Sequence, residues 1–172
     1  ELIHRIDRDT SGLVMISKKR STLKLVQDLL REHKIQKTYA AIVKGQVSLD
    51  QQLIDAPLFR YELANGERRV RVSKEGKPSK TEWNVVERFK AATLVHASPL
   101  SGRTHQIRVH GLSIGHPLIG DDKYGHSTAY AGAEARRLCL HAMRLQIPGY
   151  PTIEAPMPED MQQVLNELRK HK

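Results

Sequence analysis

Two adjacent β-strands are predicted over residues 81–98, which read TEWNVVERFKAATLVHAS. The β-branched and aromatic side chains in residues 81–89 and 92–98 fit a pleated, half-buried surface. Only two residues separate the strands, and a connection this short allows antiparallel but not parallel pairing. The segment therefore predicts an antiparallel pair within a larger sheet.

Further elements are predicted on both sides of this pair. Strands are expected at residues 13–17, 39–43 and 138–147. Helices are expected at residues 22–33, 104–114 and 159–170, the first of them capped by Ser21. Asn65-Gly66 marks a hairpin turn in the charged segment 60–80, and residues 126–136 resemble a flexible insertion. Strands outnumber helices and come in adjacent pairs, which predicts an α+β fold with a mixed, mainly antiparallel sheet and flanking helices.

The composition indicates one basic globular domain spanning residues 1–172. The chain has 28 Lys and Arg against 19 Asp and Glu, a net charge of +9, and residues 1–90 hold 19 of the 28 cations. Such an excess favours an anionic partner, with nucleic acid as the leading candidate. Aromatic residues make up only 5% of the chain, which argues against a broad stacking platform for single strands.

Several classes of protein are disfavoured by the same sequence. No apolar run approaches the ~18 residues that a membrane-spanning helix needs, so no membrane partner is expected. The single cysteine, Cys139, excludes an internal disulfide and a multi-cysteine zinc site. These features favour a cytoplasmic location.

A dense polar motif, HRIDRDTSG, occupies residues 4–12 ahead of an apolar run. A loop of this kind can hold charged groups beside a core, where their pKa values and reactivity become tunable. A plain polar turn is the alternative, because Asp9, Thr10 and Ser11 can hydrogen-bond their own backbone. A magnesium-dependent Asp-x-Asp phosphatase is a further alternative that the surrounding sequence supports poorly.

Two more segments carry candidate site residues. KTYAAIVKG at residues 37–45 places Tyr39 on a predicted strand, either as a core residue or as a face for a nucleobase. GRTHQIRVH at residues 102–110 puts Arg103 at a predicted helix start, from which its guanidinium can project into a cleft. His105 and His110 are five residues apart and do not share a helix face, so no metal site is expected.

These three segments resemble the motifs of the RluA family of pseudouridine synthases. The family patterns are His-Arg-Leu-Asp-x-x-Thr-Ser-Gly-Leu, Lys-x-Tyr-x-Ala and Gly-Arg-[Ser/Thr]-His-Gln-[Ile/Leu]-Arg-Val-His, and the first departs here only in Ile6. Residues 66–73, 75–78 and 153–157 resemble the RluC branch, which acts on large-subunit ribosomal RNA. The resemblance covers nearly the whole chain and implies the pseudouridine synthase catalytic fold.

The resemblance also implies roles for individual residues. Asp7 corresponds to the catalytic aspartate, Arg103 to the arginine that pairs with it, and Arg108 is the less favoured candidate for that pairing. Tyr39 corresponds to the tyrosine beside the target uracil, and Ile107 to a residue that lines or supports the uracil pocket. Arg5 corresponds to the arginine that enters the RNA stack.

The basic residues at 60–80 are expected to contact phosphates, with Arg68, Arg69 and Arg71 forming a hairpin that clamps the RNA. Lys18, Lys19 and Arg20 are expected to contribute further phosphate contacts, and Arg108 is also expected to contact the RNA.

The implied reaction turns uridine into pseudouridine without gain or loss of a group, so neither cofactor nor metal is expected. We expect the chain to be a monomeric catalytic domain that lacks its family's N-terminal part, including the S4-type RNA-binding domain. The rival interpretation is a non-catalytic RNA-binding or ribosome-assembly module with the same fold.

Overall fold

A computed structural model describes residues 1–125 and 129–171. Its strands are β1 (Ser11–Gly12), β2 (Gln36–Lys44), β3 (Gln51–Asp55), β4 (Leu58–Glu62), β5 (Arg68–Val72), β6 (Lys80–Arg88), β7 (Ala92–Pro99), β8 (Ala129–Tyr130), β9 (Ala133–Glu134), β10 (Leu140–Gln146) and β11 (Ile153–Glu154). Its helices are α1 (Arg20–Arg31), α2 (Gln106–Ser113) and α3 (Glu159–Arg169). Within the described residues, no helix combines the length and the apolar character needed to cross a membrane.

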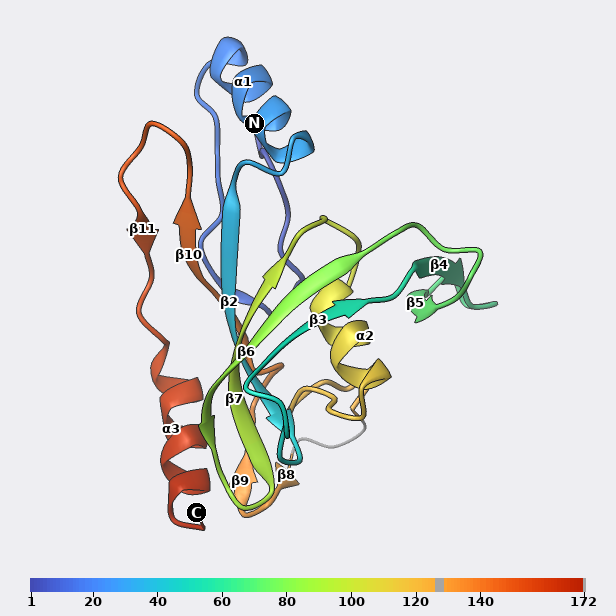
Figure 1. Cartoon of the computed structure of the whole chain (residues 1–172), viewed down its shortest axis with the longest axis vertical. Helices are drawn as coiled ribbons and strands as arrows, with labels where there is room; N and C mark the ends of the chain where they lie inside the picture. The colour runs from blue at the N-terminus through green and yellow to red at the C-terminus, as the bar shows by residue number, and fades with distance from the viewer. Residues whose placement is uncertain (126–128, 172) are drawn as a thin grey trace.

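The central sheet has the strand order β1-β10-β2-β7-β6-β3, and β11 pairs with β10. All of these pairs are antiparallel except β1 with β10, which is parallel. The predicted α+β class with a mixed, mainly antiparallel sheet is therefore confirmed. The predicted strand pair at residues 81–98 forms β6 and β7, which lie inside this sheet (Figure 1).

Strand β2 separates the two main layers of the core, because its side chains alternate between the two faces of the sheet. On one face, Ala41 and Val43 pack with Trp83 and with Ile107 of α2. On the other face, Ile42 packs against α3. The four apolar residues that α3 buries are Met161, Val164, Leu165 and Leu168, as the helical spacing predicts. Figure 1 shows α2 and α3 on opposite sides of the sheet.

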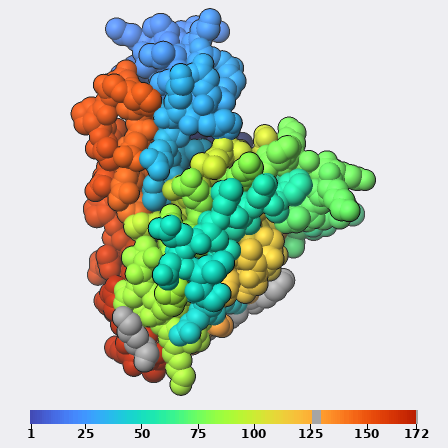
Figure 2. Space-filling model, in the orientation of Figure 1, coloured from blue at the N-terminus to red at the C-terminus, as the bar shows by residue number. Residues whose placement is uncertain are grey.

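Strands β4 and β5 form a hairpin, here called the arm (residues 58–72), that is separate from the central sheet. Its loop contains Asn65 and Gly66, and Gly66 has a φ of 85°, a conformation that glycine adopts without strain. The arm projects sideways from the body of the molecule (Figures 1 and 2). It is anchored at its base by a small cluster in which Leu58 and Val70 pack against Val109 and Tyr124.

Several predicted boundaries differ from the structure. Residues 13–17 do not form a strand of the sheet: β1 ends at Gly12, and beyond it only Ile16 makes an isolated bridge, to Leu2. Helix α1 begins at Arg20 and has Lys19, not Ser21, at its N-cap. Residues 129–134 of the expected insertion form the hairpin β8–β9, while residues 126–128 lie outside the described part of the chain.

Candidate active site

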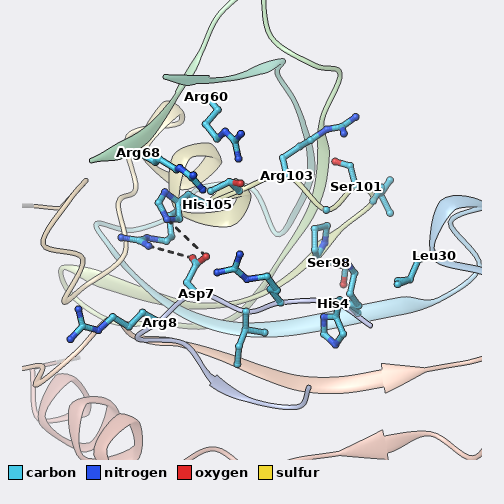
Figure 3. Close-up of a pocket in the computed structure, with 18 of the residues that line it drawn as sticks. His4, Asp7, Arg8, Leu30, Arg60, Arg68, Ser98, Ser101, Arg103 and His105 are labelled. Atoms are coloured by element: carbon cyan, nitrogen blue, oxygen red, sulfur yellow. Dashed lines mark hydrogen bonds and ion pairs between the residues drawn. The ribbon is translucent and has the colours of Figure 1, made fainter. Parts of the chain in front are cut away.

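A cleft of about 1340 Å³ lies between the arm, the N-terminal loop and the ends of β2 and β7. Figure 2 shows this recess between the projecting arm and the upper, N-terminal part of the molecule. A smaller recess of about 80 Å³ opens beside Asp7 and is lined by Tyr39, Ile107, Arg108 and Leu140. Sequence segments more than 100 residues apart therefore meet around one carboxylate (Figure 3).

The loop that carries Asp7 is held by close backbone contacts. The Thr10 amide donates a hydrogen bond to the Asp7 carbonyl at 3.0 Å, which closes a tight turn. The Met15 amide donates to Nε2 of His4 at 3.0 Å, and burial lowers the pKa of this imidazole, so His4 is a neutral acceptor. The loop is thus closed through its backbone and not by the local side-chain bonds of the polar-turn alternative, because Thr10 Oγ1 has no hydrogen-bond partner among the described residues and the Ser11 hydroxyl bonds distant side chains.

Arg137 fixes the far side of the same loop. Its guanidinium donates to the Asp9 carbonyl at 3.0 Å and to the Ser11 hydroxyl at 2.9 Å, and it pairs with Asp160 of α3 at 2.7 Å. The Ser11 hydroxyl is also bonded to Nδ1 of His141 at 2.7 Å. No sequence pattern singles out Arg137, because the loop that it holds lies more than 120 residues away in the chain.

Asp7 is paired with Arg108. Nη1 of Arg108 lies 3.3 Å from Oδ2 of Asp7, and the same guanidinium makes a bidentate pair with Asp121 at 2.8 and 2.7 Å. The side chain of Asp121 is fully buried, while that of Asp7 is 26% exposed and faces the cleft. Burial opposes the charge on Arg108, but Asp121 and Asp7 hold its pKa above the usual value. One permanently charged guanidinium therefore orients the carboxylate of Asp7.

The expected pairing of Asp7 with Arg103 is wrong. Helix α2 begins at Gln106 rather than at 104, because His105 adopts a left-handed φ of 54°. The Arg103 amide is held by the side chain of Gln106, and its guanidinium donates to the Pro78 carbonyl at 3.2 Å. Arg103 still lines the cleft, but Figure 3 shows its side chain pointing away from Asp7.

Asp121 also belongs to this site, although the sequence analysis assigned it no role. It directly follows three buried residues, namely Leu118, Ile119 and Gly120. A carboxylate in such an apolar setting needs a cationic partner, and that need is the signal by which it could be found. The same residue accepts the amides of Lys123 and Tyr124 at 3.1 Å each, so it also shapes the turn at residues 121–125.

The residues expected beside the base do line the inner recess. Tyr39 and Ile107 are 9% and 5% exposed, and both belong to the main core cluster. Burial, together with the nearby Asp7, raises the pKa of Tyr39 to about 12, so its phenol is neutral at physiological pH. Tyr39 is thus a core residue that also lines the recess, and its role beside a nucleobase stays a prediction.

The expected RNA-contacting arginines occupy different positions. Arg5 is exposed and lines both the cleft and the recess, and Arg68 lines the cleft. Arg69 is engaged within the protein, with Glu67 at 3.4 Å and the Lys123 carbonyl at 3.3 Å. Arg71 lies over the rings of Phe59 and Tyr61 outside the cleft. Arg60, one of the basic residues at 60–80 expected to contact phosphates, faces the cleft (Figure 3).

Metal-binding side chains do not cluster in groups of three or more anywhere in the described ranges 1–125 and 129–171. The histidines of the 102–110 segment have other partners. His110 shares a hydrogen bond with the Thr81 hydroxyl at 2.7 Å and bonds the Ala56 carbonyl at 2.9 Å, and His105 bonds the Tyr124 hydroxyl at 2.8 Å.

The family model of RNA pseudouridylate synthases matches residues 1–113, which contain Asp7, Tyr39 and Arg108. The chain belongs to this family. It is 46% identical to "Ribosomal large subunit pseudouridine synthase C" of Pasteurella multocida and 48% identical to the protein of that name from Escherichia coli K12. These alignments cover 100% and 98% of the chain but 55% and 56% of the relatives, so the chain spans about half their length.

Solved structures of the family agree with the fold. The chain is similar to human RNA pseudouridylate synthase domain containing 4, with a TM-score of 0.81, 26% identity, and coverage of 98% of this chain and 75% of the human one. For human RNA pseudouridylate synthase domain containing 1, the TM-score is 0.75 at 28% identity, over 92% and 68% of the two chains. The expected pseudouridine synthase catalytic fold is confirmed.

Proposed function

We propose that the protein is a pseudouridine synthase that isomerises uridines of large-subunit ribosomal RNA. The observation that carries the proposal is Asp7: among the described residues that line the inner recess, it is the only carboxylate, and Arg108 holds it. Family membership and the names of the relatives support both the reaction and the substrate class.

The reaction suits a single aimed carboxylate. The bond between N1 of uracil and C1′ of ribose breaks, and C1′ then bonds to C5 of the same uracil. C5 loses its proton and N1 takes up a proton, so the product is an isomer of the substrate. Positive charge develops at C1′ during the cleavage, and a carboxylate stabilises or traps such a charge. Asp7 serves in this role, and Arg108, not Arg103, is the cation that contacts and orients it.

The target nucleotide must leave the RNA stack to bring C1′ to Asp7, which costs a few kcal/mol that contacts in the pocket offset. Ile107 and the ring of Tyr39 offer apolar faces for the extruded uracil. Tyr39 presents a neutral hydroxyl to the extruded uracil, because burial keeps the phenol protonated. Arg5, exposed at the rim, is positioned to fill the vacancy in the stack.

Phosphate contacts come from the basic side chains around the cleft, principally Arg60, Arg68 and Arg103. Such contacts supply salt-dependent affinity with little sequence choice. Ribosomal RNA as substrate is also the reason that we propose a cytoplasmic location. We propose a monomer because residues of one chain line both the cleft and the recess.

Substituting Asp7 tests the proposal directly. Unmodified large-subunit RNA is incubated with the 172-residue chain or with its Asp7→Asn variant, and pseudouridine is mapped by carbodiimide treatment and primer extension. We expect discrete modified sites with the unsubstituted chain and none with Asp7→Asn, because an amide cannot stabilise positive charge at C1′. RNA affinity should change by no more than about twofold, since phosphates dominate binding.

Asp50→Asn is the matched control. Asp50 is 84% exposed and pairs with Arg88 away from the cleft, so this variant should modify RNA like the unsubstituted chain. RNA binding without any modification by the unsubstituted chain would support the rival non-catalytic module. Full activity of Asp7→Asn would show that Asp7 is not the catalytic group.

A further inference from the structure

Tyr124 connects the arm to the catalytic loop. Its hydroxyl accepts a hydrogen bond from the amide of Val70, in strand β5 of the arm, at 3.0 Å. The same hydroxyl is 2.8 Å from Nδ1 of His105. Tyr124 itself is only 6% exposed and packs with Val70 in the cluster at the base of the arm. One phenol group therefore joins the arm to His105.

His105 in turn faces Asp7. Its Nε2 lies 4.0 Å from Oδ1 of Asp7, while Arg108 contacts the other carboxylate oxygen, Oδ2 (Figure 3). A distance of 4.0 Å is too long for a hydrogen bond, but catalytic contacts are often long before substrate binds and shorten in the reacting complex. Oδ1 and Oδ2 are thus approached by two different side chains.

The contacts of Tyr124 determine which ring nitrogen of His105 carries the proton. Burial lowers the pKa of His105, against the opposing effect of Asp7, so the ring is neutral. The Tyr124 hydroxyl can accept from Val70 and donate its own hydrogen to Nδ1, and in that arrangement the ring proton sits on Nε2, facing Asp7. The other tautomer would place the Nε2 lone pair against a carboxylate oxygen, which is repulsive.

We propose that His105 is a positioning residue, held by Tyr124 with its Nε2–H directed at Oδ1 of Asp7, and that this contact depends on the docked arm. The arm carries Arg60 and Arg68 on the cleft, and the hydrogen bond from the Val70 amide to Tyr124 connects it to His105. Binding of RNA to the arm is therefore coupled, through Tyr124 and His105, to the orientation of the Asp7 carboxylate. This inference rests on the proposed function.

Two variants break the connection at different points. Tyr124→Phe removes the hydroxyl but keeps the aromatic ring that lies 5.1 Å from the guanidinium of Arg108. His105→Asn keeps an amide near the position of Nδ1 and tolerates the left-handed backbone at residue 105, but no longer reaches Asp7. His105→Gln is the conservative variant, because its Nε2 occupies the place of the imidazole Nε2.

The readout separates binding from chemistry. At saturating RNA in single turnover, we expect Tyr124→Phe and His105→Asn each to slow pseudouridine formation about tenfold, the effect of one lost hydrogen bond, with the dissociation constant for RNA unchanged within about twofold. His105→Gln should recover part of the rate. Tyr150→Phe, on an exposed loop, is the matched control and should keep the full rate. Unchanged rates in both test variants, or weaker RNA binding with an unchanged rate, would overturn the inference.

A second measurement does not depend on activity. Nitrogen-15 NMR of the His105 ring in the free protein should show a neutral ring with its proton on Nε2, and Tyr124→Phe should shift the tautomer equilibrium toward Nδ1. A proton on Nδ1 in the unsubstituted chain would overturn the inference. If the chain binds RNA but makes no pseudouridine, the proposed function fails, and this NMR result still decides the arrangement around His105.

Discussion

At the scale of single residues, one guanidinium serves two carboxylates. Arg108 pairs with the fully buried Asp121 through two hydrogen bonds and reaches Asp7 with its remaining terminal nitrogen. Because Asp121 cannot remain buried and unpaired, the position of Arg108 is fixed by the fold before any RNA binds. Asp7 thereby receives an oriented positive charge that needs no rearrangement during the reaction.

Arg108→Lys should therefore abolish most of the activity. A lysine can pair with Asp121 but cannot bridge to Asp7 at the same time, because it lacks the planar fork of donors. We expect the single-turnover rate to fall about a hundredfold, as when one preorganised electrostatic contact is removed. Arg103→Lys should cost only a few-fold and act on RNA affinity, since Arg103 bonds the Pro78 carbonyl. A larger loss of rate in Arg103→Lys than in Arg108→Lys would support the pairing of Asp7 with Arg103 that was first expected from the sequence.

Sequence motifs select the proposed catalytic aspartate but not its partner. Asp7, Tyr39 and Ile107 are chosen by motif, and all three line the inner recess. Arg103 and Arg108 belong to the same motif, and the choice between them depends on where α2 begins. That start is determined by the left-handed conformation of His105 and by the bonds of the Gln106 side chain, neither of which local sequence patterns reveal.

At the scale of elements, the short strand β1 fixes the loop that carries Asp7 to the sheet. Gly12 pairs with Ala142 and has a φ of 109°, and a Cβ atom at this position would lie 2.1 Å from the Ala142 carbonyl oxygen. Arg137 and His141 bind the adjacent Ser11. Glycine is therefore required here both by backbone conformation and by the close approach of a neighbouring strand.

Gly12→Ala should destabilise the fold more than Gly66→Ala does. Both glycines have positive φ, so both variants lose about 1 kcal/mol to a left-handed alanine, but nothing lies within 4 Å of a Cβ at Gly66. The clash at Gly12 should add about 1–3 kcal/mol. Urea unfolding monitored by Trp83 fluorescence measures the difference, and equal midpoints for the two variants would show that the close contact is unimportant.

The elements that the sequence predicted well are those with strong local patterns. Residues 81–98 and 159–170 carry their strand and helix periodicity within themselves, and they form β6, β7 and α3. Strand β1 exists only because residues 141–142 of β10 pair with it, about 130 residues away. Residues 13–17 have a strand-like composition, but Val14 and Ile16 are exposed at 37% and 69% and lack a neighbouring strand to complete a ladder.

At the scale of the whole molecule, the arm and the body face each other across the cleft with excess positive charge. Replacing Arg68 by Gln should weaken RNA binding and lower the slope of log affinity against log salt by about one, because one phosphate contact is lost. Arg169→Gln is the control, since Arg169 pairs with Glu87 at the far end of α3. Equal salt slopes for the Arg68 variant and the unsubstituted chain would show that Arg68 does not contact a phosphate of the RNA.

Buried histidines link the stability of the whole fold to pH. Burial lowers the pKa of His4, His96, His105 and His110, so the folded state binds protons more weakly at these sites than the unfolded chain does. The stability that they confer is complete above the unfolded value of 6.5 and is lost as the pH falls below it. Asp160, whose pKa is lowered by its hydrogen bond with Arg137, loses its contribution only at lower pH, below 3.8.

The free energy of unfolding should therefore decrease between about pH 6.5 and about pH 5, with up to about 1.4 kcal/mol per pH unit for each histidine that stays neutral in the folded state. Substituting His96 by Gln removes one of these groups and should make the slope shallower by at most that amount. His33→Asn is the control, because His33 is exposed and asparagine tolerates its φ of 56°. Urea unfolding at half-unit pH steps measures the slope. A flat profile across this range, or a steeper one in the His96 variant, would contradict the prediction. It would mean that these imidazoles accept protons in the folded state without cost. The neutral state assigned to His105 would then lose its support as well.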